Sequence, residues 1–220
     1  MDAFYITTPI YYVNDVPHLG HAYTTIVADI LARYHRAAGR DVFFLTGTDE
    51  HGQKIERAAA ERRERPQQLA DRVVSRFKST WSNLGIANDD FIRTTEPRHA
   101  TVVQELWRRL SAAGEIYLGE YDGLYCVGCE EYYTESQLGE GGTCPVHNVA
   151  VEHLKQPSYF FRMSRYGERL LRHIEDNPEF IRPAIRRNEI VSFVQGGLRD
   201  LSISRTTFDW GIPVPDDPEH

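Results

Sequence analysis

The sequence predicts an α/β fold whose main part is a doubly wound parallel sheet, interrupted by a small segment that binds metal. Two observations predict the sheet: apolar runs alternate with amphipathic stretches, and a strand, a helix and a second strand follow one another within the first 45 residues. A third observation marks the interruption, because all three cysteines lie close together in the second half of the chain.

The first βαβ unit rests on apolar spacing. An apolar run from Phe4 to Ile10 predicts a strand, and apolar residues at helical spacing from Leu19 to Ala38 predict a helix that ends at Gly39. Residues 41–45 form a short, mainly apolar run, as in a strand that is buried on both faces. Because such crossovers are right-handed, we expect parallel strands whose carboxyl ends share one crevice.

Further elements follow along the chain. Prolines and glycines bound two more helices, at residues 66–85 and 97–114, with a third strand at Phe91 and Ile92 between them. After Glu115 tyrosines and glycines become dense and alternate, which predicts short antiparallel strands that support a metal loop. Helical spacing returns at residues 166–174 and 184–194, and residues 198–203 alternate like a strand.

Composition limits the class of protein. With 220 residues, 41% hydrophobic and 26% charged, the chain is globular and fits one or two domains. No apolar run approaches the roughly 20 residues that cross a membrane and no leader is recognisable, so we expect a cytoplasmic protein without a membrane partner. The net charge of −7 does not favour nucleic acid, although two arginine groups could form basic faces or ordinary solvated helix surfaces: Arg57, Arg62, Arg63 and Arg65, and Arg182, Arg186 and Arg187.

The start of the first long helix is a candidate phosphate site. His18 and His21 lie three residues apart there, so both rings can face the same side. A helix start favours anions through its free N–H groups, and Gly20 would let an adenine ring or ribose approach the backbone. No glycine-rich phosphate loop is present. The alternative is that the two histidines are surface residues or helix caps.

The loop after the second strand, Thr48 to Gly52, is a second candidate site. In a parallel pair this loop lies beside the histidine loop, so the Asp49 carboxylate could bind an ammonium group in the same crevice. The alternative is that Asp49 or Thr48 only caps a helix beginning near Gly52.

A third site has metal-ligand spacing. Cys126 and Cys129 form a C-x-x-C pair, and Cys144 and His147 form a second knuckle fourteen residues later. Three thiolates and one imidazole match tetrahedral zinc coordination. Four protein ligands leave no open position, so we expect one structural Zn²⁺ that stabilises a segment with little apolar core of its own.

These motifs together resemble those of the methionyl-tRNA synthetases, a family of class I aminoacyl-tRNA synthetases. Their order and spacing agree over essentially the whole chain. The matching segments are residues 5–14, the H-x-G-H string, residues 47–52, the metal knuckle, residues 202–205 and residues 210–215.

The resemblance implies a Rossmann-like catalytic fold and roles for individual residues. His18, Gly20 and His21 would form the HIGH signature, which binds ATP with Mg²⁺ and stabilises the transition state. Ile10 and Tyr12 would line the methionine pocket, Asp49 would hold the amino group, and Arg205 would close the site. The implied activity is ATP-dependent formation of methionyl-adenylate and transfer of methionine to tRNA(Met).

The resemblance also implies a domain organisation. Residues 1–114 would form the first half of the catalytic domain, residues 115–195 a connective-peptide insertion with the zinc knuckle at 126–147, and residues 196–220 the start of the second half. The lysine-rich second signature of the family is not found, so we expect the N-terminal part of a longer enzyme. The alternatives are a truncated, non-catalytic module stapled by zinc, and another class I synthetase, for valine, isoleucine, leucine or cysteine.

Overall fold

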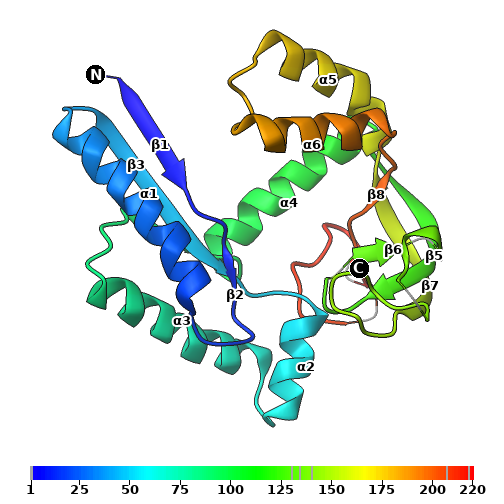
Figure 1. Cartoon of the computed structure of the whole chain (residues 1–220). Coiled ribbons are helices and arrows are strands. Elements are labelled where there is room, and N and C mark those ends of the chain that lie inside the picture. The colour runs from blue at the N-terminus through cyan, green and yellow to red at the C-terminus, as the bar shows by residue number, and fades with distance from the viewer. Residues whose placement is uncertain (1, 130, 134, 140, 207, 218) are drawn as a thin grey trace. The chain divides into compact units, whose positions relative to one another are not determined.

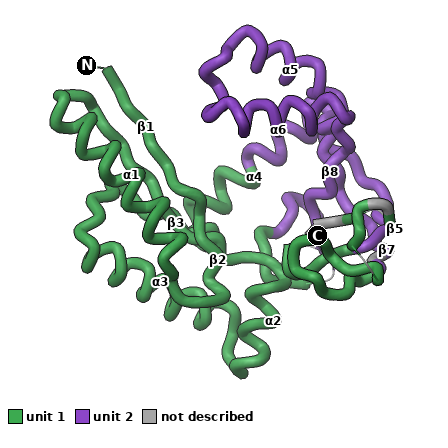
Figure 2. The backbone as a smooth tube through the Cα atoms, in the orientation of Figure 1, with its two compact units in different colours: residues 1–104, 125–152, 208–212 green, residues 105–124, 153–207, 213–220 purple. Residues whose placement is uncertain are grey.

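The computed structural model describes residues 2–129, 131–133, 135–139, 141–206, 208–217 and 219–220 (Figure 1). The chain divides into two compact units, which are described separately (Figure 2). Unit 1 contains Met1–Gln104, Tyr125–Glu152 and Phe208–Ile212, and unit 2 contains Glu105–Leu124, His153–Thr207 and Pro213–His220.

The main sheet of unit 1 is parallel, as predicted, and β3 is its central strand. Strands β1 (Ala3–Thr7), β2 (Tyr11–Tyr12) and β4 (Asp90–Arg93) all pair with β3 (Asp41–Asp49). β1 pairs with the first part of β3 and β2 with its carboxyl end.

Two sequence predictions about this sheet need correction. The first strand was expected to reach Ile10, but β1 ends at Thr7, and Tyr11 and Tyr12 form a separate strand, β2, that pairs with the same edge of β3. The second strand was expected to end at Leu45 but continues to Asp49, because β4 pairs with residues 45–48 on its other side. Gly47 permits that pairing, since a Cβ there would collide with the backbone carbonyl of Ile92.

Helix α1 (Leu19–Ala37) covers one face of the strands, but not with the side chains that its periodicity suggests. Its buried residues are small or polar: Thr25, Ala28, Asp29 and Ala32. Ala28 and Ala32 pack with Phe44 of β3 in one cluster. Leu19 and Tyr23, by contrast, are 89% and 73% exposed. Small side chains let the helix approach the strands closely.

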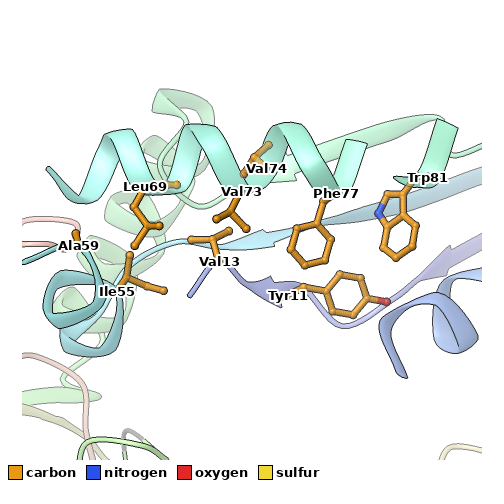
Figure 3. Close-up of a cluster of buried hydrophobic side chains, with 10 residues drawn as sticks. Tyr11, Val13, Ile55, Ala59, Leu69, Val73, Val74, Phe77 and Trp81 are labelled. Atoms are coloured by element: carbon orange, nitrogen blue, oxygen red, sulfur yellow. The ribbon is translucent and has the colours of Figure 1, made fainter. Parts of the chain in front are cut away.

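A larger apolar cluster joins β2 to α2 (Gln53–Glu61) and α3 (Pro66–Asn83). In Figure 3, Phe77 and Trp81 of α3 lie next to Tyr11, and Val73 lies next to Val13. Helix α3 begins at Pro66 and helix α4 (Pro97–Ala112) begins at Pro97, as the sequence predicts. Because Val13 belongs to this cluster, the cluster holds in place the segment between β2 and α1.

The second half of the chain contains strands and helices, as predicted, but two of the strands expected to be short are long, since β5 has 11 residues and β7 has 10. Its sheet has the order β6-β5-β7-β8, from β5 (Ile116–Cys126), β6 (Glu131–Tyr133), β7 (Glu152–Phe161) and β8 (Leu201–Ser202), and β7 and β8 are antiparallel. The helical segments are η1 (Glu135–Gln137), η2 (Met163–Tyr166), α5 (Gly167–Asp176) and α6 (Ala184–Gln195).

β8 is shorter than the strand expected at residues 198–203. The carboxylate of Asp200 accepts hydrogen bonds from Ser164 and Tyr117, so side-chain contacts replace the ladder there. Among the described helices, none has the length and apolar content that a membrane crossing requires.

Candidate functional site

Two histidines begin α1 and hold its first turn with their own ring nitrogens. His18 is the N-cap, and its Nδ1 accepts the backbone N–H of Gly20 at 3.1 Å. The Nδ1 of His21 accepts the backbone N–H of His18 at 3.2 Å. The rings stack with their centroids 3.7 Å apart, so they lie on the same side of the helix start. The capping role that the sequence left open is therefore present.

This capping leaves one donor on each ring for a ligand. A neutral imidazole has one acceptor and one donor nitrogen, so a ring whose Nδ1 accepts carries its proton on Nε2. Burial, followed by repulsion from His18, lowers the pKa of His21, which favours its neutral form. The helix start therefore offers two Nε2–H donors beside its free backbone N–H groups, which suits a phosphate.

Gly20 and Tyr11 hold this arrangement in place. A Cβ on residue 20 would lie 2.9 Å from Cε1 of His18, so the His18 ring fills the space that we expected a nucleotide to use. Tyr11 packs against His21, with ring centroids 4.7 Å apart, and its hydroxyl lies 2.9 Å from Oγ1 of Thr25. The sequence motifs did not single out Tyr11, although alternation in an extended Tyr-Tyr pair favours one buried ring.

The carboxyl end of β3 places Asp49 beside β2. Asp49 is the register partner of Tyr12, and Thr48 is the partner of Tyr11. The side chains of Ile10 and Tyr12 are about two-fifths exposed, at 41% and 39%. Through β2, the candidate ammonium site therefore adjoins the histidine pair, since Tyr11 packs on His21.

Asp49 forms no ion pair with an arginine or lysine among the described residues, and its carboxylate is partly buried. Burial raises its pKa, an effect opposed by a hydrogen bond from the backbone N–H of His51 and by the nearby charge of His99. An ammonium ligand would restore the charged form. The alternative of a helix cap is not supported, because Gly52 is the N-cap of α2 and no side chain caps that end.

Arg205 belongs to unit 2, where its guanidinium donates to its own segment. Its Nη1 donates to the Ser202 hydroxyl at 2.9 Å and to the Ser204 carbonyl at 2.6 Å. Its expected role in closing the site stays a prediction.

The four predicted metal ligands converge in unit 1. One ligand atom from each of Cys126, Cys129, Cys144 and His147 lies within 4.8 Å of all the others. Nδ1 of His147 is 3.1 Å from Sγ of Cys129, and the Sγ atoms of Cys129 and Cys144 are 3.4 Å apart. At ordinary Zn–S and Zn–N distances, tetrahedral S–S and S–N pairs would be about 3.5 to 3.8 Å apart, so these ligand atoms need only small shifts to hold a tetrahedral metal.

The thiols of this cluster differ in how readily they ionise. Burial raises the pKa of the Cys129 thiol to about 11. Although burial also acts on Cys144, the backbone N–H groups of His147 and Val146 lower its pKa to about 6. Neighbouring thiolates repel one another, and a metal ion relieves that repulsion. The cysteines are free thiols, so no disulfide competes for them.

Comparison with known proteins assigns a family to these features. A family model described as class I tRNA synthetases (M) matches residues 4–156 and 148–220. The methionine–tRNA ligase of Streptomyces coelicolor is 56% identical over 99% of this chain, which covers 42% of that protein. The methionine–tRNA ligase of Thermotoga maritima is 52% identical over 99% of this chain, which covers 35% of it.

A solved structure gives the same result. The methionyl-tRNA synthetase of Mycobacterium tuberculosis in complex with methionyl-adenylate matches the whole chain with a TM-score of 0.97 and 48% identity, and the chain covers 44% of it. The chain therefore spans less than half the length of the relatives that it matches.

Proposed function

Since this chain belongs to the methionyl-tRNA synthetases of class I, we propose that it forms the N-terminal part of an enzyme that activates methionine with ATP and transfers it to tRNA(Met). The family follows from the model match and from relatives more than 50% identical over nearly the whole chain. This identity disfavours a class I synthetase for another amino acid.

ATP would bind at the start of α1. The observation that carries the proposal is the stacked pair His18 and His21, whose Nδ1 atoms are used by the backbone and whose Nε2 atoms are left to donate. Donors fixed before the reaction stabilise charge that grows on phosphate oxygens. Gly20 would contribute by allowing the His18 ring to take this position.

Methionine would bind at the carboxyl end of β3. Asp49 would hold its ammonium group, with Ile10 and Tyr12 lining an apolar pocket and Arg205 closing the site. Support comes from the register of Tyr12 with Asp49 and from burial that raises the pKa of Asp49. An apolar pocket discriminates by only about 1 to 3 kcal/mol per methylene.

The chemistry would proceed by positioning. The methionine carboxylate attacks the α-phosphorus of ATP, pyrophosphate leaves, and no covalent enzyme intermediate forms. A hydroxyl of the terminal ribose of tRNA then attacks the carbonyl carbon of the adenylate, an ester forms, and AMP leaves as the acyl–phosphate bond breaks. Mg²⁺ bound with ATP would share the phosphate charge.

We also propose Zn²⁺ as the metal at Cys126, Cys129, Cys144 and His147. Three thiolates with one imidazole are a donor set that zinc prefers, and four protein ligands leave no position for a reacting water. Its contribution would be to the stability of the segment around residues 126–147.

The domain limits expected from the sequence, at residues 114/115 and 195/196, stay a proposal, as does the cytoplasmic location. The remaining rival is a truncated module without turnover. Calorimetric titration of the complete protein with methionine and with ATP tests the proposal, together with methionine-dependent exchange of pyrophosphate into ATP. We expect binding of both ligands and exchange; a protein that binds neither ligand would be such a module.

A further inference from the structure

Glu50, the residue that follows Asp49, has a buried carboxylate that takes no part in the proposed chemistry. The side chain of Glu50 is fully buried, and its two oxygens accept four hydrogen bonds. Oε1 accepts from Oγ1 of Thr48 at 2.6 Å and from Nε of Arg93 at 2.7 Å. Oε2 accepts from Nη2 of Arg93 at 2.8 Å and from Oγ1 of Thr95 at 2.6 Å. A buried charge persists only when it is paired this completely.

The backbone of Glu50 is held as well. Its N–H donates to Oγ1 of Thr94 at 2.9 Å, and its carbonyl accepts the indole N–H of Trp210. The carbonyl of Trp210 in turn accepts the N–H of Gly52 at 3.1 Å. Trp210 is therefore hydrogen-bonded to the residues on both sides of His51. The rings of Trp210 and His51 also meet edge-on, with their centroids 5.4 Å apart.

These contacts fix which way Asp49 points. Thr48 and Glu50 are two residues apart and hydrogen-bonded, so their side chains share one face of the extended chain. Asp49 lies between them and must leave the backbone on the opposite face. That face is the side from which a ligand would be bound in the proposed function.

We infer that the Glu50–Arg93 pair, supported by Thr95 and Trp210, is a positioning device that holds the Asp49 carboxylate in place for the amino group of the substrate. Arg93 comes from β4, where it is the register partner of Thr48, so the pair joins two neighbouring strands at their carboxyl ends. Glu50 acts through Asp49 and touches no substrate. This inference rests on the proposed function.

The histidine site depends on a different set of contacts. His18 and His21 are held by mutual capping and by Tyr11, and none of their described hydrogen bonds involves Glu50 or Arg93. A positioning role therefore predicts damage to methionine binding and not to ATP binding. A merely structural role would damage both.

Two mild variants and a control of the same chemistry test this. Thr95→Val removes one donor to Glu50 at nearly constant volume, and Trp210→Phe removes the indole donor but keeps an aromatic ring against His51. Thr101→Val is the control, because Oγ1 of Thr101 bonds only its own helix, at the Pro97 carbonyl, in the described contacts. Glu50→Gln is the strong variant.

We expect Thr95→Val and Trp210→Phe, made in the complete protein, to weaken methionine binding about tenfold, and Glu50→Gln to weaken it further. ATP binding should stay within about twofold in each folded variant, the Thr101→Val control should match wild type, and KM for methionine should rise more than kcat falls. Calorimetry with each ligand and exchange kinetics give these quantities.

The outcomes separate the two hypotheses. Suppose that wild type binds both ligands and that folded Thr95→Val and Trp210→Phe bind methionine as tightly as wild type does. The positioning role is then overturned and the proposed function stands. If the variants weaken ATP binding and methionine binding by the same factor, the positioning role is also overturned. If wild type binds neither ligand, the proposed function fails and this inference fails with it. Should Glu50→Gln not fold, the two mild variants decide.

Discussion

At the scale of single residues, the candidate site is defined by the hydrogen-bond partner of each polar group. His18 and His21 use Nδ1 on the backbone, so only Nε2 is left for a ligand. Asp49 is partly buried without an arginine or lysine partner among the described contacts, whereas its neighbour Glu50 is completely paired. Two adjacent carboxylates therefore have different environments, because Glu50 is fully hydrogen-bonded and Asp49 is not, and we propose that only Asp49 binds a ligand.

His21→Ala in the complete protein should slow adenylate formation about 100-fold or more, because it removes a preorganised donor. Loss of its capping contact should cost only about 1 kcal/mol of folding stability. Pyrophosphate exchange and thermal unfolding measure the two effects. His153→Ala is a suitable control, since that exposed ring pairs only with Asp122 among the described ion pairs. Exchange at the wild-type rate in His21→Ala would contradict the proposed role.

Asp49→Asn should abolish or strongly weaken methionine binding without lowering stability at neutral pH. Burial raises the pKa of Asp49, so the charged form opposes folding above that pKa and ceases to do so as the pH falls through it. Asn removes this cost. The melting temperature of the variant relative to wild type should therefore be highest near neutral pH and should decline towards about pH 4. A relative stability that rises on acidification would refute the assigned environment.

At the scale of elements, helix starts and metal knuckles followed from local spacing, but the orientation of α1 did not. Its apolar repeat predicts the helix correctly, yet the residues against β3 are small ones. Asp29 explains part of this orientation, because its carboxylate accepts the backbone N–H of Ala87 at 2.8 Å and pairs with Arg33. Contacts with a distant loop thus override the apolar pattern.

This orientation makes a testable distinction within one helix. Ala32 is fully buried and Leu19 is 89% exposed. Ala32→Leu should destabilise the chain by about 1 to 3 kcal/mol through overpacking, whereas Leu19→Ala should stay within about 0.5 kcal/mol. Urea unfolding of the 220-residue chain compares the two variants. The reverse order of effects would mean that the apolar face, and not the small-residue face, packs on the sheet.

At the scale of the whole molecule, the metal cluster and the main apolar cluster are separate. The cysteines pack with Tyr133, Leu138 and Val151, and these residues share no member with the cluster of β2, α2 and α3. Of the four ligands only Cys126 lies in a strand, at the end of β5, and the other three lie in turns or loops, so the knuckle has few other sources of stability.

Metal removal should therefore act locally. Chelation, or the Cys129→Ser substitution, is expected to increase amide exchange across residues 126–147 and to leave exchange in α3 slow, because α3 is anchored by its own apolar cluster. Hydrogen-exchange mass spectrometry with and without a chelator measures this. Simultaneous loss of protection in both regions would show that the two clusters unfold as one.

The sequence by itself determined the α/β class, the helix starts at Pro66 and Pro97 and the four candidate metal ligands that the fold brings together, because each depends on local spacing. Only the tertiary structure decided that Tyr11 and Tyr12 form a strand and that Glu50 is buried. It also decided that the indole N–H of Trp210 donates to the Glu50 carbonyl from 160 positions away. Spacing along the chain encodes local hydrogen bonds and periodicity. Burial depends on which distant segments arrive beside a residue, and no local pattern specifies that.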